Sequence, residues 1–286
     1  MKKNILFVFG TRPEVIKIFP IIRKLKEYSD YYNVILCNTG QQKELTEQAL
    51  SMFQLDVDYN LSVMTENQSL ETTQNKIIEK LKNIFLQKTY QAVIVQGDTL
   101  SAFCGALVAF YNHVKVLHVE AGLRTDNIEE PFPEEAYRQM ISRIATLHFA
   151  PSLQAKENLL KENIDEKNIF VCGNTVIDAL KIIIKMYSKE CKNKFFLKGI
   201  NIKSKIVLIT AHRRENQNEK LQHILTAIKN LALDFPSYNF IWPVHPNPNI
   251  RNIVYEKLSN VKNIILSAPP LIMMNLYTLC KKQISL

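Results

Sequence analysis

The chain has 286 residues, a hydrophobic fraction of 47%, a charged fraction of 22% and a formal net charge of +9. This composition excludes an intrinsically disordered chain, and the length allows two domains. No apolar run is long enough for a membrane span and the N-terminal stretch has no signal-peptide cleavage site, so we expect a cytoplasmic protein without a membrane partner. The lysines are interleaved with acids rather than clustered, which favours a small phosphorylated ligand over nucleic acid.

The first half of the sequence predicts strands that alternate with helices. Continuous apolar runs, which are typical of parallel strands buried on both faces, occur at 4–9, 33–37, 92–95, 114–119, 147–150 and 169–172. Helical patterns occur at 16–28, 43–53, 70–86, 101–111 and from Pro133 onward, whereas 56–69 shows no regular pattern. This order predicts an α/β fold with a doubly wound parallel sheet.

A second, shorter α/β unit follows. A helix from about residue 175 to Ile184 precedes a Lys- and Asn-rich stretch, 188–204, which has weak periodicity. A strand at 205–210, a helix at 221–233 and a strand at 240–243 come next. We therefore expect a Rossmann-like domain at 1–175, a crossover and linker at 176–204, and a partial nucleotide-binding domain at 205–286.

The turn after the first strand, Gly10 to Glu14, has the strand-turn-helix order of a phosphate site. Gly10 would allow close backbone approach, the helix start would offer free N–H groups, and Arg12 with Lys17 would add positive charge. The alternative is an ordinary turn with surface cations, because the sequence matches neither a Walker A loop nor a GxGxxG fingerprint.

Carboxylates follow two of the predicted strands and begin the next helix. Asp98 comes after the strand at 92–95, Glu120 after the run at 114–119, and Glu134 in a Pro-rich helix start. In open α/β sheets ligands bind outside the carboxyl ends of the strands, so these acids are candidate working groups. Asp98 could instead cap a helix, and Glu134 and Glu135 could serve the helix dipole. Glu120 must be solvated, paired or functional.

In the second unit, His212, Arg213 and Arg214 follow the strand at 205–210, and His245 follows the strand at 240–243. Guanidinium groups pair bidentately with phosphate oxygens, so the two arginines suit a diphosphate. A histidine at a strand end is often structural, but two beside an arginine pair favour ligand contact. Neither histidine has metal-ligand spacing, and we expect no metal and no cofactor.

With these residues assembled, the sequence resembles the non-hydrolysing UDP-N-acetylglucosamine 2-epimerases. The resemblance is carried by six motifs in family order: Gly10 to Glu14, Gln96 to Thr99, His118 to Thr125, Pro131 to Glu135, Ala211 to Glu215, and Pro243 to Asn247.

The resemblance implies a two-domain, glycosyltransferase-B-like fold and reversible epimerisation of UDP-GlcNAc to UDP-ManNAc, by elimination and re-addition of UDP. It also implies roles for individual residues. The catalytic candidates are Asp98, Glu120, Glu134 and His212; the UDP-binding candidates are Arg12, Lys17 and Arg213; and a second, activating UDP-GlcNAc would lie near Gln41, Gln42, Arg213, Arg214 and His245. The family usually has a histidine where this chain has Gln42. Which group is base and which is acid stays open.

The sequence departs from the family pattern after Pro269. The shifted reading frame across Met273 to Asn275 can restore the family residues, so we expect a frameshift near codons 269 to 270. An incomplete second domain would expose a sheet edge and apolar helix faces, which predicts low stability and little turnover.

Several alternatives remain open at this stage. The chain could be an inactive nucleotide-sugar-binding remnant, an epimerase of a related UDP-diacetamido sugar, or a glycosyltransferase of the same fold. Hydrolysing epimerases resemble the stretch from His118 to Thr125 less well. The resemblance further implies a homodimer formed through the first domain and a product used for cell-surface polysaccharide.

Overall fold

The computed structural model describes residues 2–65, 68–187, 205–209, 219–244 and 248–267. The predicted linker at 188–204 and the segment after Pro269, with the expected frameshift and missing strands, lie outside the described residues. The chain divides into two compact units, Met1–Ile182 and Ile183–Leu286, which are described separately. No helix in the described ranges is both long enough and apolar enough to cross a membrane.

The first unit is built on a parallel sheet with the order β3-β2-β1-β4-β5-β6-β7 among the described residues. The strands are β1 (Lys3–Phe9), β2 (Tyr32–Asn38), β3 (Tyr59–Asn60), β4 (Ala92–Gln96), β5 (Lys115–Val119), β6 (Leu147–Ala150) and β7 (Ile169–Val171). The chain runs outward from β1 to β3, returns to β4, and then runs outward in the other direction. The switch point of this doubly wound sheet therefore lies between β1 and β4, where such sheets bind ligands.

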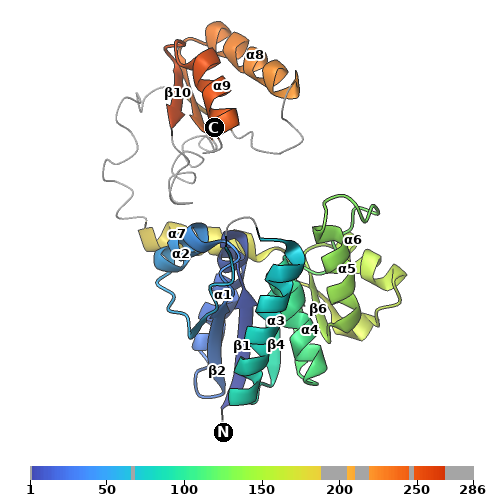
Figure 1. Cartoon of the computed structure of the whole chain (residues 1–286). Helices are drawn as coiled ribbons and strands as arrows, with labels where there is room; N and C mark the ends of the chain where they lie inside the picture. The colour runs from blue at the N-terminus through green and yellow to red at the C-terminus, as the bar shows by residue number, and fades with distance from the viewer. Residues whose placement is uncertain (1, 66–67, 188–204, 210–218, 245–247, 268–286) are drawn as a thin grey trace. The chain divides into compact units, whose positions relative to one another are not determined.

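Helices cover both faces of this sheet. They are α1 (Arg12–Lys26), α2 (Lys43–Met52), α3 (Leu70–Gln87), α4 (Leu100–Tyr111), α5 (Glu134–Ile144), α6 (Leu153–Lys161) and α7 (Thr175–Tyr187). Helices α3, α4 and α5 pack side by side, and α1 packs with α2 (Figure 1). Right-handed crossovers in opposite directions put these two groups on opposite faces of the sheet.

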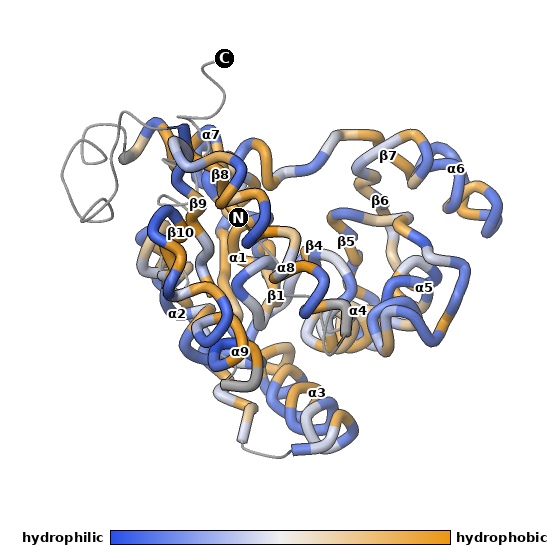
Figure 2. Tube along the Cα trace, turned by 90° about the horizontal axis from the view of Figure 1, so that it is seen from above, coloured by the Kyte–Doolittle hydropathy of each residue, from blue (hydrophilic) through white to orange (hydrophobic). Residues whose placement is uncertain are grey.

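One layer of the core lies between the sheet and helices α3 and α4. The side chains of Leu6, Val8 and Val95 are fully or almost fully buried there. Helix α3 alternates between hydrophobic and hydrophilic residues along its length (Figure 2) and buries Ile77 and Leu81. Each fully buried aliphatic side chain contributes roughly 1.5–3 kcal/mol, so this layer holds the strand ends in fixed positions.

The second unit contains a parallel sheet with the order β10-β9-β8 among its described residues. Its elements are β8 (Lys205–Leu208), α8 (Glu219–Asp234), β9 (Tyr238–Pro243), α9 (Pro248–Leu258) and β10 (Ile264–Ser267). Trp242 of β9 is fully buried and packs in one cluster with Leu225 of α8 and Val254 of α9. The unit therefore has a core of its own.

The structure corrects the predicted elements in a few places. The segment 56–69, which has no regular pattern, contains the short strand β3, which pairs with β2. The sequence prediction also omitted α6, α9 and β10. The predicted strands and helices of the first unit otherwise occur within a few residues of their expected bounds.

Candidate active site

Three acidic side chains lie at or near the carboxyl ends of the central strands. Asp98 follows β4, Glu120 directly follows β5, and Glu134 is the first residue of α5. Burial raises the pKa of Asp98, the Arg138 guanidinium opposes this rise, and the negative charges of Glu134 and Glu120 add to it. Because the charges of both glutamates act on Asp98, the structure brings the three carboxylates into one interacting group.

Glu120 is held by residues from distant parts of the chain. Its Oε1 accepts a hydrogen bond from Lys17 Nζ at 2.7 Å, and its Oε2 accepts one from Asn174 Nδ2 at 2.8 Å. Its backbone has a φ of 65°, in the left-handed region that few residues other than glycine adopt. Such strain costs on the order of 1 kcal/mol or more and is common at functional sites, where the surrounding contacts hold it.

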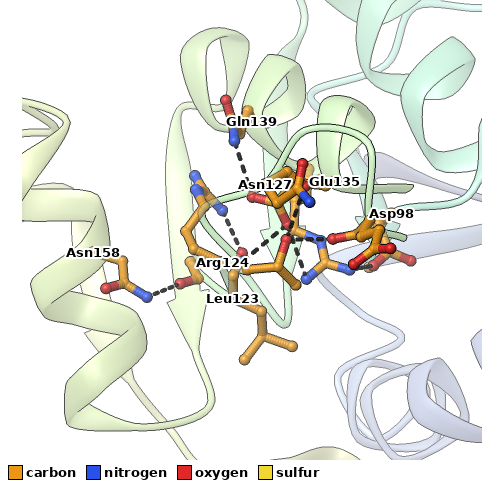
Figure 3. Close-up of polar contacts among 12 residues, drawn as sticks. Asp98, Leu123, Arg124, Asn127, Glu135, Gln139 and Asn158 are labelled. Atoms are coloured by element: carbon orange, nitrogen blue, oxygen red, sulfur yellow. Dashed lines mark hydrogen bonds and ion pairs between the residues drawn. The ribbon is translucent and has the colours of Figure 1, made fainter. Parts of the chain in front are cut away.

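Asp98 is held by α5. Its Oδ2 lies 2.6 Å from a terminal nitrogen of Arg138, and the other terminal nitrogen of Arg138 lies 3.4 Å from Glu135 Oε2. Glu135 is fully buried and also accepts hydrogen bonds from the Thr125 backbone N–H and the Gln139 side chain (Figure 3). Arg138 therefore lies between a structural carboxylate and a candidate catalytic one.

Neither Asp98 nor Glu134 occupies a helix N-cap position. The N-cap of α4 is Thr99, whose hydroxyl oxygen accepts a hydrogen bond from the Ala102 N–H at 3.0 Å, so Asp98 does not cap this helix. Glu134 and Glu135 do lie in the first turn of α5, as a helix start requires, but the cap position is Pro133 and has no side-chain cap bond. The carboxylate of Glu135 instead fixes the loop at Thr125.

The turn after β1 differs from the prediction. The N–H groups of Gly10 and Thr11 both donate to Glu14 Oε2, at 3.0 and 2.8 Å. The Arg12 N–H points to Gln42 Oε1 at 3.5 Å. A Cβ on Gly10 would come within 2.1 Å of the Thr39 hydroxyl oxygen, so the glycine is needed for packing. The expectation of free N–H groups for phosphate is therefore wrong, because a carboxylate of the same helix already occupies them.

The stretch after β5 is anchored on both sides. Arg124 donates to both carboxylate oxygens of Glu162, at 2.5 and 2.9 Å, and to the Ser142 hydroxyl at 2.9 Å. Gly122 has a φ of 88°, and a Cβ there would come within 2.2 Å of the Ala155 carbonyl oxygen. Only glycine fits at this close approach to α6. These contacts position the stretch that begins with Glu120.

His118 supports the turn before Asp98. This histidine is fully buried in β5, and its Nε2 lies 2.8 Å from the Gly97 carbonyl oxygen. The Gly97 N–H donates to the Val119 carbonyl at 2.9 Å, so both sides of Gly97 are bound to β5. Burial lowers the pKa of His118 to about 3. The ring is therefore neutral at pH 7 and its Nε2 donates to the carbonyl.

Two candidates for an activating ligand, Gln41 and Gln42, lie between β2 and α2. Gln41 Oε1 accepts hydrogen bonds from the Ser101 hydroxyl at 2.7 Å and the Ser101 N–H at 3.2 Å, so its oxygen holds the start of α4. Gln42 is exposed at the N-cap position of α2. The remaining candidates of the second unit, His212, Arg213, Arg214 and His245, lie outside the described residues.

Three site residues had no predicted role. Glu14 lies in the motif Gly10 to Glu14, Arg138 follows Glu134 and Glu135 at helical spacing, and Asn174 lies in the turn between β7 and α7. Helical spacing and position after a strand were therefore the available signals. Among the described residues no group of three or more His, Cys, Asp or Glu side chains is arranged to hold a metal ion.

The fold and these residues define an α/β protein whose polar groups converge at the switch point of a doubly wound sheet. Residues 23–283 match the family model described as UDP-N-acetylglucosamine 2-epimerase. A UDP-N-acetylglucosamine 2-epimerase of Salmonella borreze is 46% identical over 270 residues, which are 93% of this chain and 71% of the relative. The chain therefore belongs to the UDP-N-acetylglucosamine 2-epimerase family.

Solved structures agree with this assignment. The UDP-GlcNAc 2-epimerase of Neisseria meningitidis, crystallised with UDP-GlcNAc, is 40% identical with a TM-score of 0.85, and the match covers 97% of this chain and 75% of that one. Staphylococcus aureus MnaA in a co-structure with UDP is 35% identical with a TM-score of 0.86, and the match covers 99% and 73%. The expected glycosyltransferase-B-like α/β fold is confirmed by these neighbours.

Proposed function

We propose that this chain interconverts UDP-N-acetylglucosamine and UDP-N-acetylmannosamine by inverting the configuration at C2. The observation that carries the proposal is the group of Asp98, Glu120 and Glu134 at the switch point, with Lys17 in contact with Glu120. Removal of a proton from carbon needs a positioned base, and departure of a diphosphate needs positive charge. The family assignment supplies the nucleotide sugar as the ligand.

The reaction proceeds in two halves. A carboxylate takes the C2 proton, the C–H electron pair forms the C1=C2 double bond, and UDP leaves with the electrons of the C1–O bond. An acid then delivers a proton to the opposite face of C2, and UDP adds again at C1. Asp98, Glu120, Glu134 and His212 are the proposed acid and base groups, and which of them acts on which face stays open.

Positive groups hold the diphosphate in this proposal. Arg12, Lys17 and Arg213 bind the nucleotide, and Lys17 also touches Glu120, so diphosphate and carboxylate share one ammonium group. The N–H groups of the turn after β1 are occupied by Glu14, so side chains rather than backbone donors supply this binding. A second UDP-GlcNAc near Gln41, Gln42, Arg213, Arg214 and His245 remains part of the proposal.

Epimerisation in D₂O tests the function. The purified chain is incubated with UDP-GlcNAc and followed by ¹H NMR. The proposed function predicts UDP-ManNAc and deuterium at C2 of both sugars, whereas the departure of the sequence from the family pattern after Pro269 predicts little turnover, and the measured rate decides between them. Asp98→Asn, Glu120→Gln and Glu134→Gln should each lower the rate by about a hundredfold or more, as removal of a general acid or base does. Glu129→Gln is the matched control, because Glu129 is an exposed carboxylate of the nearby loop.

Calorimetric binding of UDP-GlcNAc distinguishes the alternatives. Binding without deuterium uptake would contradict the epimerase proposal and favour a nucleotide-sugar-binding remnant. Turnover of a UDP-diacetamido sugar in preference to UDP-GlcNAc would change the substrate and retain the chemistry. The proposed homodimer follows from the family resemblance, and light scattering on the purified chain tests it. The cytoplasmic location stays an expectation from the sequence.

A further inference from the structure

Glu14 links the two turns that flank the switch point. It is 1% exposed and lies in the first turn of α1. Its Oε2 accepts the N–H groups of Gly10 and Thr11, at 3.0 and 2.8 Å, in the turn after β1. Its Oε1 accepts the hydroxyl of Thr99, at 2.8 Å, in the turn after β4. One carboxylate thus connects the ends of β1 and β4, and Glu14 and Thr99 lie 85 residues apart in sequence.

The two turns carry proposed active-site residues. Thr11 directly precedes Arg12, and Thr99 directly follows Asp98. Glu14 therefore fixes the backbone from which one proposed phosphate ligand and one proposed acid or base project. A small displacement of such groups can cost a large factor in rate, because the reacting atoms must meet in a narrow range of geometries.

Both carboxylate oxygens of Glu14 must act as hydrogen-bond acceptors, one for Gly10 and Thr11 and the other for Thr99. The Thr99 oxygen already accepts the Ala102 N–H as the cap of α4, and the hydroxyl has a single proton, which it donates to Glu14. A glutamine at position 14 would have one oxygen for Gly10 and Thr11 and would turn an NH₂ group toward Thr99. The Thr99 proton would then lose its acceptor, and the turn that contains Asp98 would move.

The stability of the fold does not explain why residue 14 carries an ionisable carboxylate. Burial raises the pKa of Glu14 to about 7, although four hydrogen bonds, from the Gly10 and Thr11 backbone and the Thr99 and Thr11 side chains, oppose this rise. The ionised form is therefore disfavoured by its surroundings, and above pH 7 a neutral amide avoids that cost, which offsets the lost hydrogen bond to Thr99. The carboxylate of Glu14 is therefore needed for something other than stability.

We propose that Glu14 is a positioning residue for the epimerase reaction and that its carboxylate holds Arg12 and Asp98 in register across the switch point between β1 and β4. The role rests on the proposed function. Glu14 does not contact the sugar in this proposal; it acts through Thr99 and through the backbone before Arg12.

The test compares Glu14→Gln and Thr99→Val with Thr99→Ser. We expect Glu14→Gln and Thr99→Val to lower kcat by about tenfold or more. The thermal unfolding midpoint of Glu14→Gln should be unchanged or raised, because the substitution removes positioning without unfolding the chain. Thr99→Ser keeps the hydroxyl that donates to Glu14 and caps α4, so its kcat should equal that of the wild type. Ser152→Ala is the control for a lost cap, because Ser152 caps α6 through the Ala155 N–H.

A second readout does not require turnover. The ¹³Cγ signal of Asp98, assigned by its absence in Asp98→Asn, reports the titration of this carboxyl group. Glu14→Gln should shift that titration, since the turn that contains Asp98 moves relative to Arg138 and Lys17, whereas Ser152→Ala should leave it unchanged. An inactive wild-type chain would contradict the proposed function, and the role of Glu14 would then be decided by this signal. Wild-type kcat together with an unshifted Asp98 signal in Glu14→Gln would overturn the inference.

Discussion

The substitution Glu14→Gln should stabilise the first unit above neutral pH. The pKa of Glu14 rises from its usual 4.5 to about 7 because the group is buried. The unfolded chain therefore ionises above pH 4.5, whereas the folded chain keeps the proton until about pH 7. Between these values the free energy of unfolding of the wild type falls as pH rises. At about 1.4 kcal/mol per pKa unit, the cost of keeping the charge buried above pH 7 is roughly 3 kcal/mol.

Glutamine does not titrate, so the difference between the two proteins isolates this residue. We expect similar unfolding free energies near pH 4.5, a growing advantage of Glu14→Gln up to pH 7, and a constant advantage of about 2–3 kcal/mol above it. Contributions from other titrating groups, such as His118 and His148, are common to both proteins and cancel. The sign follows from the raised pKa, because an acid with a raised folded pKa stabilises the fold only while it is protonated.

The assay is urea unfolding between pH 4.5 and 8.5, followed in the first unit by hydrogen exchange of peptides from β1 and β4. The only tryptophan of the chain, Trp242, is fully buried in the second unit, so its fluorescence gives a separate transition within the same sample. That transition should be identical in both proteins. A difference in β1 and β4 that stays constant with pH, or a loss of stability in Glu14→Gln at pH 8, would refute the reasoning.

Other changes test further contacts of the candidate active site. Lys17→Met removes a charged partner of Glu120 and a proposed phosphate ligand, so calorimetry should show UDP binding weakened by about tenfold or more. Arg138→Lys replaces a planar fork with a point charge, so the pKa of Asp98 in a ¹³C titration should rise and turnover should fall; an unchanged titration would contradict the contact. As pH falls from 6.5 to 5, the unfolded chain protonates His118 but the buried ring stays neutral, so the wild type loses up to about 1.4 kcal/mol of stability per pH unit. His118→Gln should remove this part of the pH dependence of the unfolding free energy.

The sequence was most informative about the central strands of the first unit. A parallel strand covered on both faces needs apolar side chains at successive positions, so β1, β4 and β5 stand out as continuous runs. The end of each run also marks where ligand-binding residues begin, which led to Asp98 and Glu120. The short strands were harder to predict. In β10, Ile264–Ser267, a few apolar residues suit a helix equally well, and β3, Tyr59–Asn60, has no apolar run.

Contacts between distant segments could not be predicted, because they depend on the order of strands in the sheet. Lys17 and Glu120 lie 103 residues apart in sequence and 2.7 Å apart in the structure. The same limit explains the error at the turn after β1. The pattern Gly10 to Glu14 fits both a phosphate site with free N–H groups and a helix start whose glutamate occupies them. The burial of Glu14 and its hydrogen bond from Thr99 show that the glutamate occupies these N–H groups.

The same contacts explain how three carboxylates can lie together at the end of this sheet. Burial is the main cause of the raised pKa of Asp98, and the nearby negative charges of Glu134 and Glu120 raise it further. The opposing positive charges come from two helices, with Lys17 of α1 on Glu120 and Arg138 of α5 on Asp98. The sequence motifs contain the three carboxylates but neither Lys17 nor Arg138, and they do not show which charges pair. The pairing comes from the doubly wound sheet, because α1 and α5 both begin at the carboxyl ends of its strands although they are far apart in the sequence.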